Sequence, residues 1–392
     1  MNKIVYFDNA ATSHPKPERV YAAVEHFHRN IGASPGRSGH RLAIEAGRVV
    51  LETRDRLAAL LNVADPARVI LTPSCTEALN IAIKGLVRPG DHVVTSSVEH
   101  NSVMRPLRKM QADGTIDLTV VPCAPDGRLE PSDVRDQLRP ETRLVVVTHA
   151  SNVVGTIQPV GDIGCLVKAH GARLLVDVAQ SAGAMPINMA DMGIDLLAFS
   201  GHKNLLGPQG TGGLVIGENV ELATLIEGGT GSRSQDELQP EFLPDRHEAG
   251  TPNAPGIAGL AEGIAHVQKL GIPSIQQTLQ ELTALVLEEL ARTPGATVYG
   301  PGDPTRQTAV VSFTLQDTDI TAVSTALDRQ FGILTRVGLQ CSPGAHRTIG
   351  TFENWGGTVR VSLGVFNTME EIKFFGESLR TIQASGNGGR NG

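Results

Sequence analysis

Short apolar runs alternate with segments of helical length between residues 69 and 217. Each run is apolar at successive positions, so both faces of its strand would be buried, which is typical of a parallel sheet covered by helices. We therefore predict an α/β fold with a doubly wound, mostly parallel sheet of seven strands. The runs are VILT at 69–72, HVVT at 92–95, LTVV at 118–121, LVVVT at 144–148, LLVDV at 174–178, LLAFS at 196–200 and GLVIG at 213–217. The last run follows LLAFS too closely for a helical crossover, which indicates one antiparallel strand and a mixed sheet.

The segments around this sheet predict further helices and a second group of strands. Apolar residues recur at helical spacing in the segments expected to be helices, whereas the later apolar segments alternate with a period of two. The expected helices are 41–61, 76–86, 102–111, 130–138, 162–170, 257–270 and 275–291, and the later strands are 308–315, 333–338 and 359–364.

Two domains are expected from this change of pattern and from the length of 392 residues, because one hydrophobic core rarely grows that large. We place a large α/β domain at 15–255 and a smaller α+β domain at 1–14 together with 256–383. The tail, 384–392, is polar and Gly-rich, so we expect it to be disordered.

Composition narrows the classes of function. The net charge is −7, so there is no basic field for a phosphate backbone, and we expect no nucleic-acid partner. No apolar run approaches the roughly 18 residues of a membrane span, so we expect a cytoplasmic protein without a membrane partner. The four cysteines are too far apart for a zinc site or a disulfide framework. The 43 glycines suggest many tight turns and favour an enzyme.

Polar residues gather directly after the predicted strands, where ligands bind in open α/β sheets. Thr76 lies in a turn that presents free N–H groups to an anion; the turn also fits an ordinary helix cap. His100 follows the next strand and has a flat ring that could stack on a heterocycle. Asp177 and Gln180 lie at the end of the LLVDV strand. A buried Asp177 carboxylate would need a cation as its partner, unless it caps a neighbouring loop. Lys203 in SGHK could form an imine with an aldehyde once it is desolvated, although most lysines are surface charges. Together these residues predict a site for pyridoxal phosphate.

The chain resembles the fold-type I, class V aminotransferase family, and within it the second group of cysteine desulfurases and the related selenocysteine lyases. The resemblance covers nearly the whole chain and rests on several blocks in order. They are YFDNAAT, TEALN, EHNS, HASNVVGTIQP, DVAQS, SGHK, EAGTPN and RVSLGVFNTMEE.

The resemblance implies a role for each candidate residue of the cofactor site. Lys203 would bind pyridoxal 5'-phosphate covalently, Asp177 would pair with its ring nitrogen, Gln180 would contact its hydroxyl and His100 would stack on its ring. Phosphate ligands would be Thr76, Ser200 and His202, with Thr251 reaching across from a second subunit. That last role implies a homodimer.

A second set of residues is implied for the substrate. Arg360 would grip its carboxylate, a role that suits the planar guanidinium, although a surface ion pair is the more common state of an arginine. Asn152 would make a further contact with the carboxylate or with the ring hydroxyl. Arg336 and His40 resemble residues that line the site.

Cys341 lies in the loop GLQCSPGAH, whose Gly and Pro residues favour an exposed turn. The segment RVGLQCSP resembles the family's short loop that carries the sulfur-accepting cysteine. Cys75, Cys123 and Cys165 fit the more common class of buried, inert thiols, with Cys75 near the cofactor. Many relatives have His directly before the reactive cysteine, whereas this chain has Gln340, which is neither an acid nor a base.

These observations predict an enzyme that converts L-cysteine to L-alanine and leaves a persulfide on Cys341 for a sulfur-acceptor protein. A selenocysteine lyase, or another class V β-lyase or aminotransferase, is the alternative within the family. Selenium is a better leaving group than sulfur, so the reaction with selenocysteine would be slowed less by the missing His. A third hypothesis is a non-catalytic scaffold that only transfers or stores sulfur. The presence of Lys203 and Asp177 argues against this hypothesis.

Overall fold

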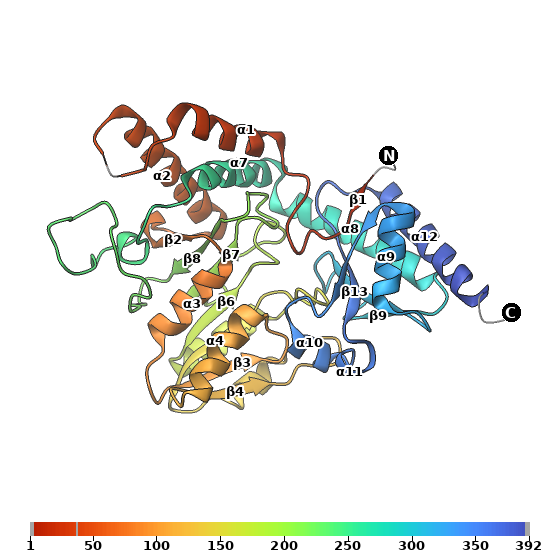
Figure 1. The fold of residues 1–392 in the computed structure, drawn as a ribbon. Coiled ribbons are helices and arrows are strands. Elements are labelled where there is room, and N and C mark those ends of the chain that lie inside the picture. Colours follow the sequence, from red (N-terminus) through yellow and green to blue (C-terminus); the bar gives the residue numbers. More distant parts are fainter. Residues whose placement is uncertain (1–3, 37, 389–392) are drawn as a thin grey trace.

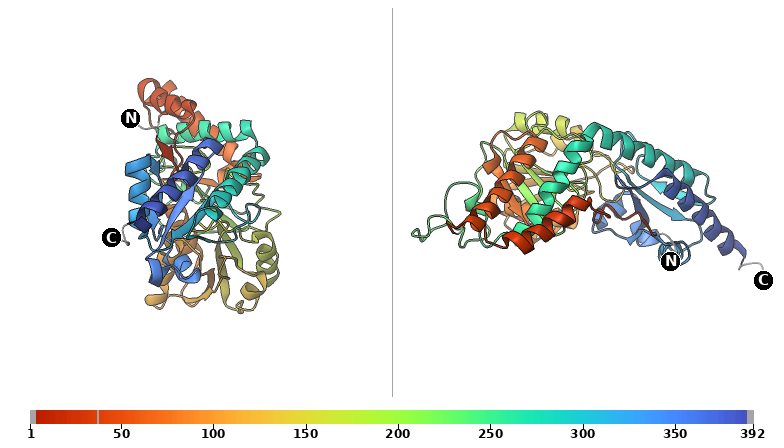
Figure 2. Two further views of the ribbon diagram at one scale, coloured as in Figure 1. Left: turned by 90° about the vertical axis from the view of Figure 1, so that its right-hand side faces the viewer. Right: turned by 90° about the horizontal axis from the view of Figure 1, so that it is seen from above.

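The computed structural model describes residues 4–36 and 38–388. A larger and a smaller body lie side by side, each built on its own sheet, and both ends of the described chain lie at the smaller body (Figure 1). Two consecutive helices, α7 (Ala254–Leu270) and α8 (Ile272–Ala291), run from one body to the other (Figure 2).

The larger body contains a seven-stranded sheet in the order β2-β8-β7-β6-β5-β3-β4. Only β8 runs antiparallel to its neighbours β2 and β7, so the prediction of a mostly parallel, mixed sheet is confirmed. The strands are β2 (Val69–Thr72), β3 (His92–Ser96), β4 (Asp117–Val121), β5 (Thr142–Thr148), β6 (Arg173–Asp177), β7 (Leu196–Ser200) and β8 (Gly212–Ile216).

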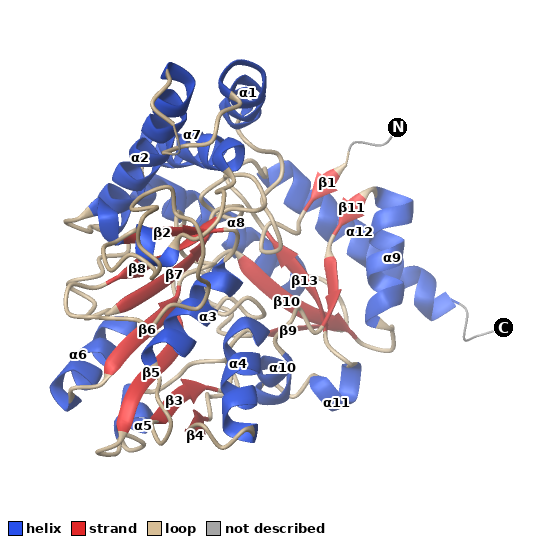
Figure 3. Cartoon of the chain, turned by 60° about the vertical axis from the view of Figure 1, so that its left-hand side comes forward, coloured by secondary structure: helices blue, strands red, loops and turns tan. Residues whose placement is uncertain are grey.

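Helices cover both faces of this sheet (Figure 3). Successive strand residues enter opposite cores because side chains alternate along a strand: Val145 and Leu174 lie in one cluster, and Val146 and Leu175 in the other. The first cluster receives side chains from α2 (Arg41–Leu61), α5 (Pro131–Arg135), α6 (Val160–His170) and α7. The second receives them from α3 (Cys75–Leu86) and α4 (Asn101–Ala112).

The smaller body is an antiparallel sheet covered by helices. Its four strands follow the order β12-β13-β10-β9, and a short parallel pair, β1 with β11, lies beside them. Phe7 and Phe313 each meet Phe375 edge to face in the core, with ring centroids 5.8 and 5.9 Å apart. The elements are β1 (Val5–Tyr6), β9 (Ala296–Tyr299), β10 (Val310–Leu315), β11 (Ile333–Leu334), β12 (Arg336–Gly338), β13 (Thr358–Ser362), α9 (Ile320–Phe331) and α12 (Met369–Gly388).

Several elements depart from the pattern-based expectations. The segment 333–338 is not one strand, because it divides into β11 and β12, which pair in different sheets. Helix α7 carries Leu260 and Ile264 into the core of the larger body and Val267 into that of the smaller, so the division expected at residue 255 stays a prediction. Elements that were not predicted are α1 (Glu18–His26), the π-helix η1 (Phe27–Ile31), the 3-10 helices η2 (Pro66–Arg68) and η3 (Asp245–His247), α10 (Pro343–Thr348), α11 (Phe352–Trp355), α9, α12, β1 and β9.

The expected disordered tail is partly helical. Helix α12 continues to Gly388, which corrects the expectation for 384–388, whereas 389–392 lie outside the described residues. Ile372, Phe375 and Leu379 anchor the earlier turns of α12 in the core, and extending an anchored helix costs far less than starting one. Among the described helices, none is both long and apolar enough to cross a membrane.

Candidate active site

The predicted residues meet in a cavity of about 260 Å³ between the carboxyl ends of the large sheet and loops of the smaller body. This is the edge at which ligands bind in open α/β sheets. All the predicted site residues except Thr251 and His40 line it. Those that do are Thr76, His100, Asn152, Asp177, Gln180, Ser200, His202, Lys203, Arg336, Cys341 and Arg360.

The half-buried Lys203 and the buried Asp177 form the charged centre of the cavity. Lys203 follows β7 after a tight turn at Gly201, where an added Cβ would lie 2.3 Å from Oγ1 of Thr211. Burial lowers the pKa of the Lys203 amine, and Asp177 opposes that shift. Asp177 ends β6; its Oδ1 accepts from the N–H of Ala179 at 2.9 Å and lies 3.5 Å from the thiol of Cys75. Within the described chain Asp177 has no ion-pair partner, so its charge is free to meet a cation in the cavity.

Hydroxyl and imidazole groups gather at the N-terminus of α3. The Ser74 hydroxyl accepts from the N–H of Glu77 at 3.3 Å, which is the predicted cap, and Oγ1 of Thr76 lies 2.7 Å from Oγ of Ser102. Nδ1 of His202 is buried and has no hydrogen-bond partner among the described residues. A helix N-terminus with free donors beside it suits a phosphate group. Ser102 lies in the EHNS segment, but nothing in the sequence indicated its role at this site.

His100 is held as a neutral ring. Its Nδ1 accepts from the N–H of Ser102 at 3.0 Å, so the proton of the neutral ring lies on Nε2. Burial lowers the pKa of His100 to about 4, although Asp177 opposes the shift. The ring therefore carries no charge at neutral pH, and it lines the cavity as a flat surface.

Gln180 and Cys75 support this part of the cavity. The side-chain amide of Gln180 donates to the carbonyl of Ala10 at 3.1 Å, which ties the YFDNAAT segment to the loop after β6. Burial raises the pKa of the Cys75 thiol well above its ordinary value, and Asp177 adds to the increase. Cys75 therefore lies near the predicted cofactor position, as expected, and stays a thiol.

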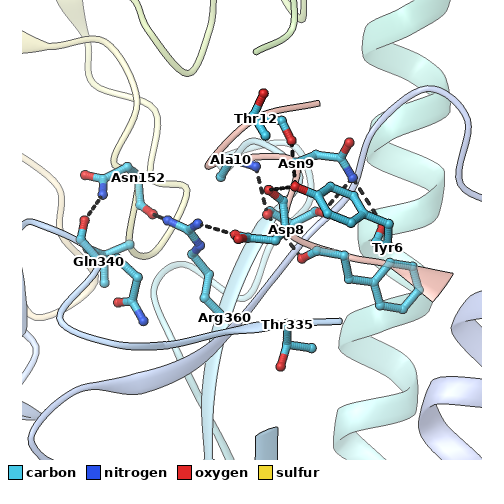
Figure 4. A network of polar contacts seen from close by, with 12 residues as sticks. Tyr6, Asp8, Asn9, Ala10, Thr12, Asn152, Thr335, Gln340 and Arg360 are labelled. Carbon is cyan, nitrogen blue, oxygen red and sulfur yellow. Dashed lines mark hydrogen bonds and ion pairs between the residues drawn. The ribbon is translucent and has the colours of Figure 1, made fainter. Parts of the chain in front are cut away.

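Arg360 is buried between the N-terminal segment and Asn152 (Figure 4). One terminal nitrogen donates to Oδ1 of Asp8 and the other to the carbonyl of Asn152, both at 2.8 Å. Nε is buried without a hydrogen-bond partner among the described residues. Burial lowers the pKa of Arg360, and Asp8 counters that effect, while a guanidinium stays charged in either case. Asp8 lies in the YFDNAAT segment, but the sequence did not predict that it pairs with Arg360.

Arg336 adds a second cation at the rim. It lies opposite Arg360 in the register of β12 with β13 and is exposed. Like charges directly opposite one another on a sheet repel, so an anion in the cavity would relieve this pair.

Cys341 is exposed at the edge of the cavity, on a loop with an uncommon backbone conformation. Its φ is +62° and that of Gln340 is +44°, a region that side chains with a Cβ rarely adopt. The exposed turn that the Gly and Pro residues predicted is therefore present. Among the remaining thiols, Cys75 is buried and Cys123 half-buried, but Cys165 is exposed. The expectation of a buried Cys165 is wrong, because α6 turns Ile163 and Val167 inward and Cys165 toward solvent.

Thr251 and His40 do not reach the cavity of their own chain. Thr251 is exposed just before α7. His40 is the exposed N-cap of α2, where its Nδ1 accepts from the N–H of Ala43 at 3.3 Å. Both side chains are therefore exposed on the single chain, where a second molecule could contact them. Their expected roles in the site stay predictions.

A family model described as aminotransferase class-V matches residues 5–375. The chain belongs to the aminotransferase class-V family. Relatives of the family include a probable cysteine desulfurase from Methanothermobacter thermautotrophicus, which is 36% identical over 387 residues, 97% of this chain and 95% of that one. A cysteine desulfurase from Escherichia coli is 31% identical over 387 residues, 94% of this chain and 91% of that one.

Solved structures agree with the family assignment. The apo structure of a cysteine desulfurase from Thermococcus onnurineus matches with a TM-score of 0.91 and 32% identity, over 97% of this chain and 95% of that one. The family resemblance and the fold class predicted from the sequence are thereby confirmed.

Proposed function

We propose that this protein is a pyridoxal phosphate-dependent cysteine desulfurase that converts L-cysteine to L-alanine and receives the sulfur on Cys341. One observation carries the proposal: a half-buried amine, a buried carboxylate without an ion-pair partner among the described residues, a buried guanidinium and an exposed thiol line one cavity. The relatives named as cysteine desulfurases over nearly the full length support the same reaction.

The residues present fit pyridoxal phosphate. Lys203 would bind its aldehyde carbon, and Asp177 would pair with its ring nitrogen. Nδ1 of His202, which has no hydrogen-bond partner among the described residues, would hold the phosphate together with Thr76 at the start of α3 and Ser200 at the end of β7. When bound, the cofactor withdraws electrons from the substrate Cα.

Each side chain then has a defined task. Arg360 binds the substrate carboxylate through N–H groups that its bonds to Asp8 and Asn152 leave free, with Asn152 beside it. The Lys203 amine, whose pKa is lowered by burial, removes the proton from Cα. The Cys341 thiolate attacks the substrate sulfur: an S–S bond forms, the C–S bond breaks, and its electron pair stays on the substrate carbon. That carbon, Cβ, takes up a proton, the proton removed by Lys203 returns to Cα so that alanine is formed, and Cys341 keeps the sulfur as a persulfide.

The remaining predicted roles require partners. We propose a homodimer in which Thr251 reaches the phosphate of the other subunit and His40 approaches the same cavity, since both residues are exposed. An acceptor protein would then take the persulfide sulfur from the exposed Cys341.

The test measures alanine and sulfide release from L-cysteine under reducing conditions. Wild type is compared with Cys341→Ala and with the matched control Cys165→Ala, which removes the other exposed thiol. Loss of activity only in Cys341→Ala supports the proposal. Activity without Cys341 would point to another β-lyase, and turnover of L-selenocysteine alone would point to a selenocysteine lyase.

A further inference from the structure

Gln340, next to Cys341, lines the cavity, and both ends of its side-chain amide are hydrogen-bonded. Its amide nitrogen donates to the carbonyl of Thr358 in β13 at 3.0 Å, and its amide oxygen lies 2.7 Å from Nε2 of His346. All three residues are buried. The residue that replaces the expected His is therefore part of a hydrogen-bond network behind the loop.

The direction of each hydrogen bond in this network is determined. A carbonyl only accepts, so Thr358 fixes which end of the Gln340 amide carries nitrogen. The amide oxygen must then accept from Nε2 of His346, which leaves Nδ1 as the acceptor of the Thr351 hydroxyl at 2.8 Å. Burial lowers the pKa of His346 to about 4, which agrees with a neutral ring that has one donor and one acceptor.

The main chain of the same loop is held from the opposite side. The carbonyl of Gln340 accepts from the side chain of Asn152 at 2.6 Å, and the carbonyl of Cys341 accepts from the N–H of Asn101 at 2.8 Å. Two consecutive residues with positive φ would relax to ordinary conformations if nothing held them. The side chain of Gln340 joins this turn to the ring of His346, and the backbone N–H of His346 also donates to the carbonyl of Ser342 at 3.4 Å.

We propose that Gln340 and His346 are positioning residues that hold the backbone turn from which Cys341 presents its thiol to the cavity. In this chain, the position before the cysteine acts through backbone geometry, without any proton transfer. Neither side chain hydrogen-bonds to Arg360 or Lys203 among the described contacts, so we expect the pair to affect the thiol more than substrate binding. This inference deepens the proposed function, and its kinetic test rests on that function.

The kinetic test compares wild type with Gln340→Met, which has a similar length but no hydrogen-bonding group. We expect a tenfold or greater fall in the rate at which Cys341 becomes persulfidated in a single turnover, with KM for L-cysteine changed less than twofold. Gln277→Met, an exposed position on α8, serves as the matched control and should behave as wild type. A rise in KM at an unchanged persulfidation rate, or no change at all, would overturn the proposal.

A second pair of variants separates a lost hydrogen bond from a damaged fold. His346→Gln keeps a side-chain N–H that can donate to Gln340, whereas His346→Leu does not. We expect His346→Gln to retain most of the persulfidation rate and His346→Leu to lose it. Equal loss in both would mean that the volume of the imidazole matters and not its donor, which contradicts the proposal. This pair also decides the question if Gln340→Met does not fold.

Hydrogen–deuterium exchange tests the positioning role without any activity. The amides of residues 339–342 should exchange at least tenfold faster in Gln340→Met than in wild type, while those of α8 stay unchanged. If wild type does not turn over L-cysteine, the proposed function fails, yet this comparison still decides whether the pair holds the loop. Unchanged exchange at 339–342 would refute the inference.

Discussion

Acid pH should destabilise the protein through His149, a histidine buried behind the active site. Its ring nitrogen lies 3.0 Å from the hydroxyl of Ser181, and its backbone N–H donates to the carbonyl of Asp177 at 2.9 Å. Burial lowers the pKa of His149 from 6.5 to about 4. The unfolded chain therefore binds a proton more readily than the folded chain below pH 6.5, so stability is lost as pH falls toward 4.

The size of this loss follows from the two pKa values. The His149 imidazole contributes almost nothing to the pH dependence of stability above pH 7.5. Its titration lowers the free energy of unfolding by about 0.8 kcal/mol at pH 6 and by about 2 kcal/mol at pH 5. His149→Gln keeps a hydrogen-bond acceptor for Ser181 and cannot titrate. We expect this variant to be less stable than wild type at pH 7.5, by about 1 kcal/mol for the altered packing and hydrogen bond. Between pH 7.5 and pH 5 the difference in free energy of unfolding between His149→Gln and wild type should shift by about 2 kcal/mol in favour of the variant.

Urea unfolding of the cofactor-free protein at pH 7.5, 6 and 5 measures this difference. Other buried histidines titrate in both proteins, so their contributions cancel in the comparison. His170→Gln removes an exposed histidine at the end of α6 and provides the control. The reasoning is refuted if the difference between His149→Gln and wild type stays constant from pH 7.5 to 5.

Three further substitutions test the surroundings of the cavity. Burial raises the pKa of the Glu99 carboxyl from 4.5 to about 8. Between pH 4.5 and pH 8 this carboxyl is therefore protonated in the folded chain and ionised in the unfolded chain. Stability is lost as pH rises, so in urea unfolding Glu99→Gln should gain about 3.5 kcal/mol on wild type between pH 5 and 8, and an equal pH response would contradict this. Asp8→Ala leaves Arg360 buried without its ion-pair partner and should lower the free energy of unfolding by about 3–5 kcal/mol, whereas a change below 1 kcal/mol would indicate that water replaces the carboxylate. Gly201→Ala forces a Cβ against Thr211 and should cost about 1–3 kcal/mol in the same assay, unless the turn moves without strain.

The large sheet was predictable because its signal is local. Strands buried on both faces form continuous apolar runs, and each of the seven runs overlaps its observed strand. Once the strand ends are known, the polar residues that follow them must gather at one edge of a parallel sheet. Thr76, His100, Asp177 and Lys203 could therefore be placed in one cavity before any contact between them was known.

The contacts that orient the site were not predictable, because they join segments that are far apart in the chain. Asp8 lies beside Arg360 only because the beginning of the chain pairs with β11 and β13 of the smaller body. Neither end of the chain has a periodicity that indicates this pairing. In the same way, Gln340 reads as the loss of a proton-transfer group until His346 is seen behind it, six residues further on. The sequence identifies the groups that react, whereas the tertiary contacts determine how those groups are held in position. In this protein Gln340, directly before Cys341, is one of the residues that hold a reacting group in position.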